Sequence, residues 1–286
     1  MDTDLSEAVN RLPKDWWKTI EISSTCSNLF KGYILGLMLS GKIYGTNQTT
    51  LFSGFLFEFE NTLIWFTAGH VIECINRILS DNNPDEVTGR WMDWETIPGA
   101  ESIPMNFKEF HPFSSQDYSH DLGMYILGPL ETEIIRKNEH SICFHVDQAT
   151  DIQNFEPEGY FLLGFPASLR EEARINQFQS SFKSALVCLP IAKIPFSPDL
   201  PFQTPNPNAF HGKIIDFPDS PSTQFSVPGM SGGPVIGIKR DPLKGIDYRL
   251  FAIQSDWLSE SRLIRAEPIL EPVQWIKEIW NSSRTD

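Results

Sequence analysis

Short apolar and aromatic runs, separated by turn residues, recur along most of this 286-residue chain. Runs of this kind occupy residues 32–40, 50–58, 62–67, 122–127, 160–164, 181–189, 234–238 and 248–254. Their β-branched and aromatic residues favour strands, and turn residues such as Gly41, Glu60 and Asn61 lie between them. The 21 prolines and 18 glycines suit many short strands joined by turns. We therefore expect an all-β fold.

Two segments have helical rather than strand periodicity. Apolar residues within 70–79, including Val71, Ile75 and Ile78, fall near one face of a helix. Apolar residues near the C-terminus repeat this spacing and predict one helix near 268–281. By contrast, the polar stretch 81–99 and the proline-rich stretch 191–228 are predicted to be mostly loop.

The first 29 residues are predicted to form a polar arm. We expect one short helix at 5–12, ended by Pro13, with Trp16 and Trp17 holding the arm against the body of the protein. The acidic start has neither the basic nor the apolar region of a signal peptide. The longest apolar stretch, around 33–39, is too short to span a bilayer. These features predict a cytoplasmic protein without a membrane partner.

Charge and cysteine content narrow the partners and the chemistry. The chain has 37 acidic and 23 basic residues, a formal net charge of −14. Such a surface repels phosphate backbones, so we expect no nucleic-acid partner. The four cysteines are too few for a disulfide framework, and none forms a C-x-x-C pair or has a histidine at metal-ligand spacing. We therefore expect neither a metal nor a cofactor.

The run PGMSGGPV, residues 228–235, is the strongest chemical signal. A serine hydroxyl is a poor nucleophile that needs a base and donors for the oxyanion it creates. Glycines on both sides of Ser231 let the backbone turn sharply and present its N–H groups. The alternative is an ordinary glycine-rich turn between strands. The run also fits the G-x-S-x-G elbow, but none of the six histidines follows Ser231, as that elbow requires.

Two further segments could supply the base and the group that orients it. The run WFTAGHVI places His70 at a small-residue turn after an apolar strand, and HDLGMYIL places Asp121 just before another strand. Taken alone, His70 could be a core histidine and Asp121 a strand-edge acid, for which role Asp117 is the nearest rival. The chain order His, Asp, Ser is, however, one of the few known triad orders.

Together these segments resemble the trypsin-like, or chymotrypsin-fold, serine peptidases, especially their bacterial HtrA-like branch. FSGFL followed by FTAGHV is similar to that branch's GSGF and TAxHV stretches, and DLG at 121–123 is similar to its DLA. LGFP at 163–166 resembles GYP, and GMSGGP at 229–234 resembles GNSGGP. The resemblance covers roughly residues 30–257, without the peptide-binding domain that HtrA proteins append.

The resemblance implies an architecture and a mechanism. It implies two antiparallel β-barrels with the active-site cleft between them and a C-terminal helix. The expected division is an arm at 1–29, barrels at 30–128 and 156–257, a linker at 129–155 and a helical C-terminal segment at 258–286. His70 would be the general base and acid, Asp121 would orient it, and Ser231 would be the nucleophile. The N–H groups of Gly229 and Ser231 would form the oxyanion hole.

The resemblance also implies a pocket for the side chain that precedes the cut. Phe225 and Ser226 would lie at its base, and Ser255 and Trp257 along its wall. Phe225 stands where peptidases that select Lys or Arg carry an aspartate, so we expect an uncharged residue, apolar or small, before the cut. Ser255 aligns with the family serine that supports the buried aspartate. His211 lies before the nucleophile and could reach this pocket.

These inferences predict a serine endopeptidase that cleaves proteins or peptides through an acyl-enzyme. Met230 replaces the aspartate that pairs with a freshly cut N-terminus in the digestive enzymes, so activation by that ion pair is not available. An active peptidase in the cytoplasm would need control, and we expect narrow specificity or an activating partner. One alternative is a catalytically silent homologue that serves as a binding or scaffold module. An esterase using the same residues is a weaker one.

Overall fold

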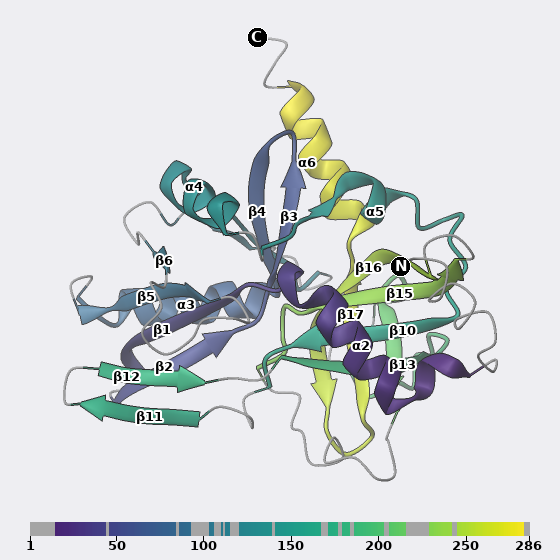
Figure 1. Cartoon of the computed structure of the whole chain (residues 1–286), viewed down its shortest axis with the longest axis horizontal. Helices are drawn as coiled ribbons and strands as arrows, with labels where there is room; N and C mark the ends of the chain where they lie inside the picture. Colours follow the sequence, from purple (N-terminus) through teal and green to yellow (C-terminus); the bar gives the residue numbers. More distant parts are fainter. Residues whose placement is uncertain are drawn as a thin grey trace.

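The structure is a computed structural model built largely from strands (Figure 1). It describes residues 15–43, 46–83, 86–92, 103–105, 110, 112–114, 120–138, 141–166, 171–176, 179–183, 186–202, 206–215, 229–241 and 245–282. The expected all-β fold with a C-terminal helix is confirmed, since a closed six-stranded barrel and further sheets dominate the described residues.

The N-terminal half contains two sheets. The first has the order β2-β1-β5-β6, and the second has the order β7-β8-β4-β3-β9. Their strands are β1 (Gly36–Ile43), β2 (Thr46–Phe52), β3 (Phe55–Phe59), β4 (Thr62–Thr67), β5 (Thr88–Met92), β6 (Ile103–Pro104), β7 (Phe113–Ser114), β8 (Gly123–Ile126) and β9 (Phe144–His145). The expected turn at Glu60 and Asn61 is confirmed, because both have positive φ, the conformation of a tight hairpin turn.

The C-terminal half forms the closed barrel, in the order β10-β13-β14-β17-β16-β15. Its strands are β10 (Gly159–Gly164), β13 (Val187–Lys193), β14 (Phe210–Ile214), β15 (Pro234–Asp241), β16 (Gly245–Leu258) and β17 (Leu263–Pro268). A separate hairpin joins β11 (Glu171–Asn176) to β12 (Gln179–Lys183). β17 lies beyond residue 257, where we expected the second barrel to end. Two loop expectations were wrong in part, because β5 lies within 81–99 and β14 lies within 191–228.

Two of the helices match the sequence-based expectation. α3 (Gly69–Ser80) follows β4 and buries Val71, Ile75 and Ile78, and α6 (Leu270–Ser282) follows β17. The segment expected to link the barrels contains α4 (Pro129–Lys137) and α5 (Val146–Thr150). Within the described ranges, no helix is long and apolar enough to cross a lipid bilayer.

From residue 15 onward, the segment expected to be a polar arm forms regular helices. It contains two short 3-10 helices, η1 (Trp16–Lys18) and η2 (Lys31–Tyr33), and between them α2 (Ile20–Phe30), which packs on β13. The helix expected at 5–12 lies outside the described residues. Trp16 and Trp17 are buried as expected, and the Trp16 indole donates to Glu158 at 2.8 Å. The segment is therefore anchored to the barrel half.

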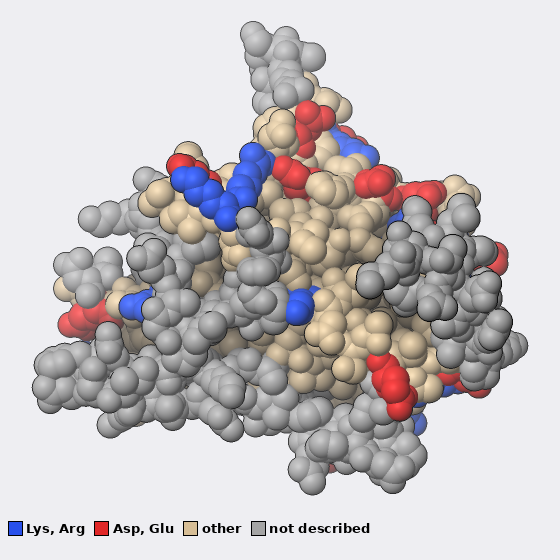
Figure 2. All heavy atoms as spheres, in the orientation of Figure 1, with Lys and Arg blue, Asp and Glu red and all other residues tan. Residues whose placement is uncertain are grey.

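The charged side chains are distributed rather than gathered. Figure 2 shows acidic residues spread around the described surface of one face, with smaller groups of basic residues among them. Several are paired across elements, such as Arg240 with Glu158 at 2.8 Å and Arg136 with Glu58 at 2.7 Å. Exposed pairs of this kind contribute little to stability individually.

Candidate active site

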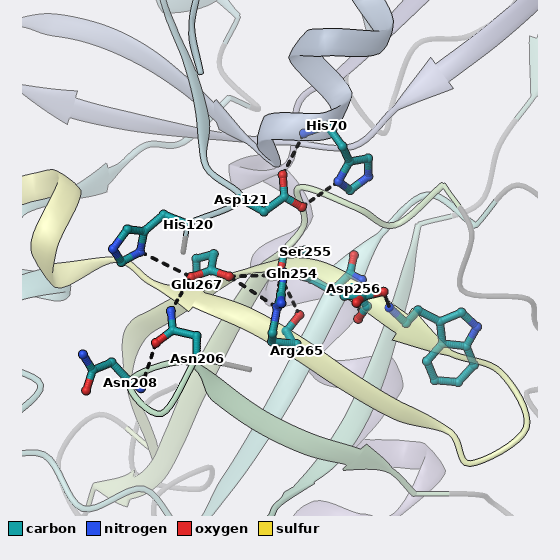
Figure 3. A network of polar contacts seen from close by, with 11 residues as sticks. His70, His120, Asp121, Asn206, Asn208, Gln254, Ser255, Asp256, Arg265 and Glu267 are labelled. Carbon is teal, nitrogen blue, oxygen red and sulfur yellow. Dashed lines mark hydrogen bonds and ion pairs between the residues drawn. The ribbon is translucent and has the colours of Figure 1, made fainter. Parts of the chain in front are cut away.

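His70 and Asp121 meet where β4 passes into α3. Strand β4 pairs with β8 so that Thr67 lies opposite Gly123, which brings Asp121 beside the first turn of the helix. The Asp121 carboxylate accepts a hydrogen bond from the main-chain N–H of His70 at 2.7 Å, and its other oxygen lies 2.7 Å from His70 Nδ1 (Figure 3). Gly69 makes this approach possible, since a Cβ there would lie 2.8 Å from Asp121 Oδ1.

The environment of His70 favours its charged form. The imidazole side chain is 47% exposed, whereas that of Asp121 is 22% exposed. Burial alone would lower the pKa of His70, but the hydrogen bond and charge of Asp121 oppose it, and the charges of Asp256 and Glu73 add to them. The net effect raises the pKa of His70 above its ordinary value. This is the electrostatic setting of a base that must hold a proton during a reaction.

Ser231 lies in a tight turn held against β16. Gly229 and Gly232 have φ values of 95° and 92°, which glycine adopts without strain. The Gly232 N–H donates to the Gln254 carbonyl at 2.8 Å, and the Gln254 N–H donates to the Gly233 carbonyl at 2.9 Å. The backbone of the turn is thus fixed to β16 at two successive residues, through the Gly232 N–H and the Gly233 carbonyl.

The same turn packs on β4, the strand that leads into the helix carrying His70. Ser53 is fully buried, and its hydroxyl donates to the Gly229 carbonyl at 2.6 Å and accepts from the Phe165 N–H at 2.9 Å. The Thr67 hydroxyl donates to the Ser53 carbonyl at 2.8 Å. A Cβ on Gly232 would lie 2.1 Å from Thr67 Oγ1, so the turn and the end of β4 are in close contact.

Ser53 and Thr67 help to hold the turn that carries Ser231, a part that their sequence motifs do not reveal. Ser53 lies between β2 and β3, Thr67 is the last residue of β4, and both are fully buried. A small hydroxyl residue at a predicted core position is a usable signal, because a buried polar group needs a hydrogen-bond partner. The sequence alone does not give the partners, which come from residues far along the chain.

Ser231 and the donors beside it are not engaged with other described groups. Among the described residues, no hydrogen bond joins the Ser231 hydroxyl to His70, and the N–H groups of Gly229 and Ser231 donate to no protein acceptor. Two free N–H groups in one turn are suited to bind an oxyanion. Hydrogen bonds between nucleophile and base are often long without substrate and shorten when it binds.

A second polar network lies on the far side of Asp121 (Figure 3). Glu267 is buried, and its carboxylate contacts Asn206 at 3.2 Å, Arg265 at 3.4 Å and His120 at 3.6 Å. Burial, together with the nearby charge of Asp121, raises the pKa of Glu267 although Arg265 and His120 oppose this.

Ser255 belongs to this second network. Its hydroxyl donates to the Arg265 carbonyl at 3.2 Å and lies 3.5 Å from Glu267. Among the described contacts it makes no hydrogen bond to Asp121, which the family alignment had implied. A register shift between Gln254 and Asp256 in the pairing of β16 with β17 places Ser255 at an irregularity of the strand.

The remaining residues of the expected pocket have different outcomes. Phe225 and Ser226 lie outside the described residues. Trp257 lies on β16 and packs against the barrel core. His211 is buried on β14 beside the rings of Phe196 and Phe202, and burial lowers its pKa.

Met230 fills interior space beside the nucleophile. It is fully buried, and its Cα lies 3.1 Å from the point that a Cβ on Gly164 would occupy. Over the described part of the chain, no group of three or more His, Cys, Asp or Glu side chains could hold a metal ion. The four cysteines are free thiols.

Comparisons with known proteins give a limited result. No family model matches the sequence, and no curated protein matches it. Among solved structures, the active form of the Rv3671c protease from M. tuberculosis has a TM-score of 0.44 and 13% identity, covering 88% of this chain and 82% of that one. The tobacco vein mottling virus protease has a TM-score of 0.42 and 9% identity, covering 85% and 79%. Both TM-scores are below 0.5, so the likeness adds nothing to the geometry above.

Proposed function

We propose that this chain is a serine-type endopeptidase with the triad His70, Asp121 and Ser231. The observation that carries the proposal is the doubly hydrogen-bonded pair of Asp121 with His70, at 2.7 Å for both contacts, beside a turn that presents a serine. The contact of Gly232 with Thr67 supports it, because it ties that turn to the strand preceding His70. The motif resemblance to trypsin-like peptidases points the same way.

In the proposed reaction, Ser231 Oγ attacks the carbonyl carbon of the scissile peptide bond while its proton passes to His70 Nε2. The N–H groups of Gly229 and Ser231 stabilise the resulting oxyanion. The carbon–nitrogen bond then breaks, and His70 gives its proton to the leaving amine. Water, deprotonated by His70, attacks the carbonyl carbon of the acyl-enzyme. The ester C–O bond then breaks, His70 returns the proton to Ser231 Oγ, and the acid product leaves and loses its own proton to solvent. Asp121 remains ionised and stabilises the imidazolium.

A second candidate is a catalytically silent homologue that binds a partner in the same cleft. It is favoured by one observation, the lack of a hydrogen bond between Ser231 and His70 among the described residues. The same observation fits a latent peptidase that a partner activates, which is the form of regulation we propose. We also propose that the protein acts in the cytoplasm on protein or peptide substrates. Vigorous casein cleavage by the isolated protein would contradict latency.

A fluorophosphonate probe separates the first two candidates. The probe reacts with a serine that an adjacent base activates. We expect it to label the wild type and the control Ser80→Ala, whose serine is exposed on α3, faster when an activating protein is present, but not Ser231→Ala or His70→Ala in either condition. Absence of labelling in the wild type, with and without candidate activating proteins, would favour the silent homologue.

A further inference from the structure

Besides Arg249 Nε in its first half, β16 has two buried polar atoms without a hydrogen-bond partner among the described residues. They are the side-chain oxygen of Gln254, Oε1, and the indole nitrogen of Trp257, Nε1. Gln254 is 1% exposed. Buried polar atoms in native proteins are almost always paired, so an unpaired donor and an unpaired acceptor on one strand call for an explanation.

The two side chains occupy neighbouring positions on the inner face of the barrel. Gln254 lies opposite Ala266 and Trp257 lies opposite Ile264, and both partners belong to the barrel core. Opposed residues in paired strands share a face. The register shift after Gln254 makes Trp257 the next residue on that face, although three positions separate them in sequence.

This place on the barrel lies directly behind the proposed nucleophile. The main-chain N–H and carbonyl of Gln254 are the groups that hold Gly233 and Gly232, at 2.9 Å and 2.8 Å. A substrate side chain that entered the barrel beside Ser231 would therefore approach the side chain of Gln254. Its backbone position is fixed by the same two hydrogen bonds that fix the turn.

The hydrogen-bonding role of each orphan atom is determined. The Gln254 amide nitrogen donates to the Asp256 carbonyl at 3.1 Å, which leaves Oε1 as an acceptor. An indole N–H can only donate. The pair therefore offers one acceptor and one donor, and a carboxamide offers the complementary donor and acceptor. We propose that the pocket takes a carboxamide side chain, glutamine or asparagine, before the cut. The proposal rests on the proposed function; it keeps the expectation of an uncharged residue but replaces an apolar or small side chain by a polar amide.

Other side chains match the two atoms poorly. A carboxylate would place an acceptor against Gln254 Oε1 and has no donor for it. A lysine or arginine has no acceptor for the Trp257 indole, and an apolar side chain leaves both atoms unpaired. Sites built to hydrogen-bond a substrate group reject analogues that lack it far more strongly than apolar pockets reject a size difference.

The test compares peptides that differ only at the residue before the cut, with Gln, Asn, Glu or Met there. Methionine is close to glutamine in size but has no amide. We expect wild-type kcat/KM for Gln to exceed that for Met on the order of 100-fold. Gln254→Met should reduce this ratio to a few-fold, and Trp257→Phe, which keeps a ring but removes the donor, should also reduce it. Gln274→Met, on the exposed side of α6, should leave it unchanged.

Fluorophosphonate labelling tests the peptidase proposal independently of the carboxamide pocket, because the probe carries no side chain that would enter this pocket. If the probe labels Ser231 but kcat/KM is about equal for the Gln and Met peptides, the carboxamide pocket is overturned and the peptidase proposal stands. If nothing is labelled or cleaved, the pocket is tested by binding alone: calorimetry measures the affinity of Ser231→Ala for peptides that end in Gln or in Met. A preference of tenfold or more for Gln upholds the pocket, and equal binding overturns it. Trp257→Phe provides the readout if Gln254→Met does not fold.

Discussion

Asp121 holds His70 twice, through the ring nitrogen Nδ1 and through the main-chain N–H, with both contacts at 2.7 Å. The ring contact selects the tautomer with the proton on Nδ1, which leaves Nε2 unprotonated and able to accept a proton. The main-chain contact fixes the carboxylate to the start of α3. One side chain therefore sets both the protonation pattern and the position of the imidazole.

Replacing Asp121 by asparagine should nearly abolish reactivity. If the new amide group donated to Nδ1 of His70, the ring proton would stay on Nε2, which is the wrong tautomer for a base. We expect Asp121→Asn to slow fluorophosphonate labelling by about 10³–10⁴-fold. The exposed Asp199→Asn is the matched control and should stay within about twofold of the wild type. Near-normal labelling of Asp121→Asn would show that Asp121 does not orient the base.

The labelling rate should rise with pH as His70 loses its proton. Because Asp121, Asp256 and Glu73 together raise the pKa of His70, the midpoint should lie above the ordinary value of 6.5. Removing one of these charges favours the neutral form, so Asp256→Asn should move the midpoint down. Glu73→Gln should move it in the same direction by less. A wild-type midpoint below 6.5, or an upward shift in Asp256→Asn, would contradict this electrostatic account.

Gly232 should tolerate no side chain. Gly232→Ala combines a positive φ of 92° with a Cβ placed 2.1 Å from Thr67 Oγ1. We expect it to lower the free energy of unfolding by about 3 kcal/mol or more. Gly245→Ala also has a positive φ, 78°, but meets nothing within 4 Å, and should cost about 1–2 kcal/mol. Urea denaturation measures both, and equal losses would mean that the turn does not press on β4.

Ser53 should affect both stability and reactivity. Ser53→Ala leaves the Gly229 carbonyl and the Phe165 N–H without their shared partner, which should cost about 1–3 kcal/mol of unfolding free energy. It should also slow labelling, because the turn beside Ser231 is less firmly held. Ser40→Ala removes a half-buried hydroxyl paired with Thr49 at 2.9 Å and should cost clearly less. A Ser53→Ala protein with wild-type stability and labelling rate would show that Ser53 does not hold the turn beside Ser231.

The strand-rich pattern and two helices were predictable because they depend on local spacing. The apolar residues of α3 repeat at helical spacing, and those of β4 form an uninterrupted run. Helix α2 was missed because its serines and threonine are weak helix formers. Its order comes from tertiary contacts, with Cys26 and Phe30 buried and the Ser23 hydroxyl bonded to the Cys188 carbonyl. β5 was missed for a similar reason, since its strand pairing with β1 buries Trp91 within a polar stretch.

In the candidate site, too, features set by local sequence were predictable and features set by tertiary contacts were not. His70, Asp121 and Ser231 could be proposed from motifs, and the pairing of the first two is present in the structure. The hydrogen bonds of Ser255 could not be foreseen, because the register shift beside it arises from how β16 meets β17. Phe225 and Ser226 lie outside the described residues and stay a prediction.

The strand order of the barrel also determines when the site can exist during synthesis. A ribosome releases His70 and Asp121 first and Ser231 later, but the barrel closes only when β17 inserts between β14 and β16. The Gln254 backbone that holds the nucleophile turn lies on β16, after Ser231 in the chain. A nascent chain therefore carries all three groups before it can align them, and translation itself delays assembly of the site until β17 has emerged.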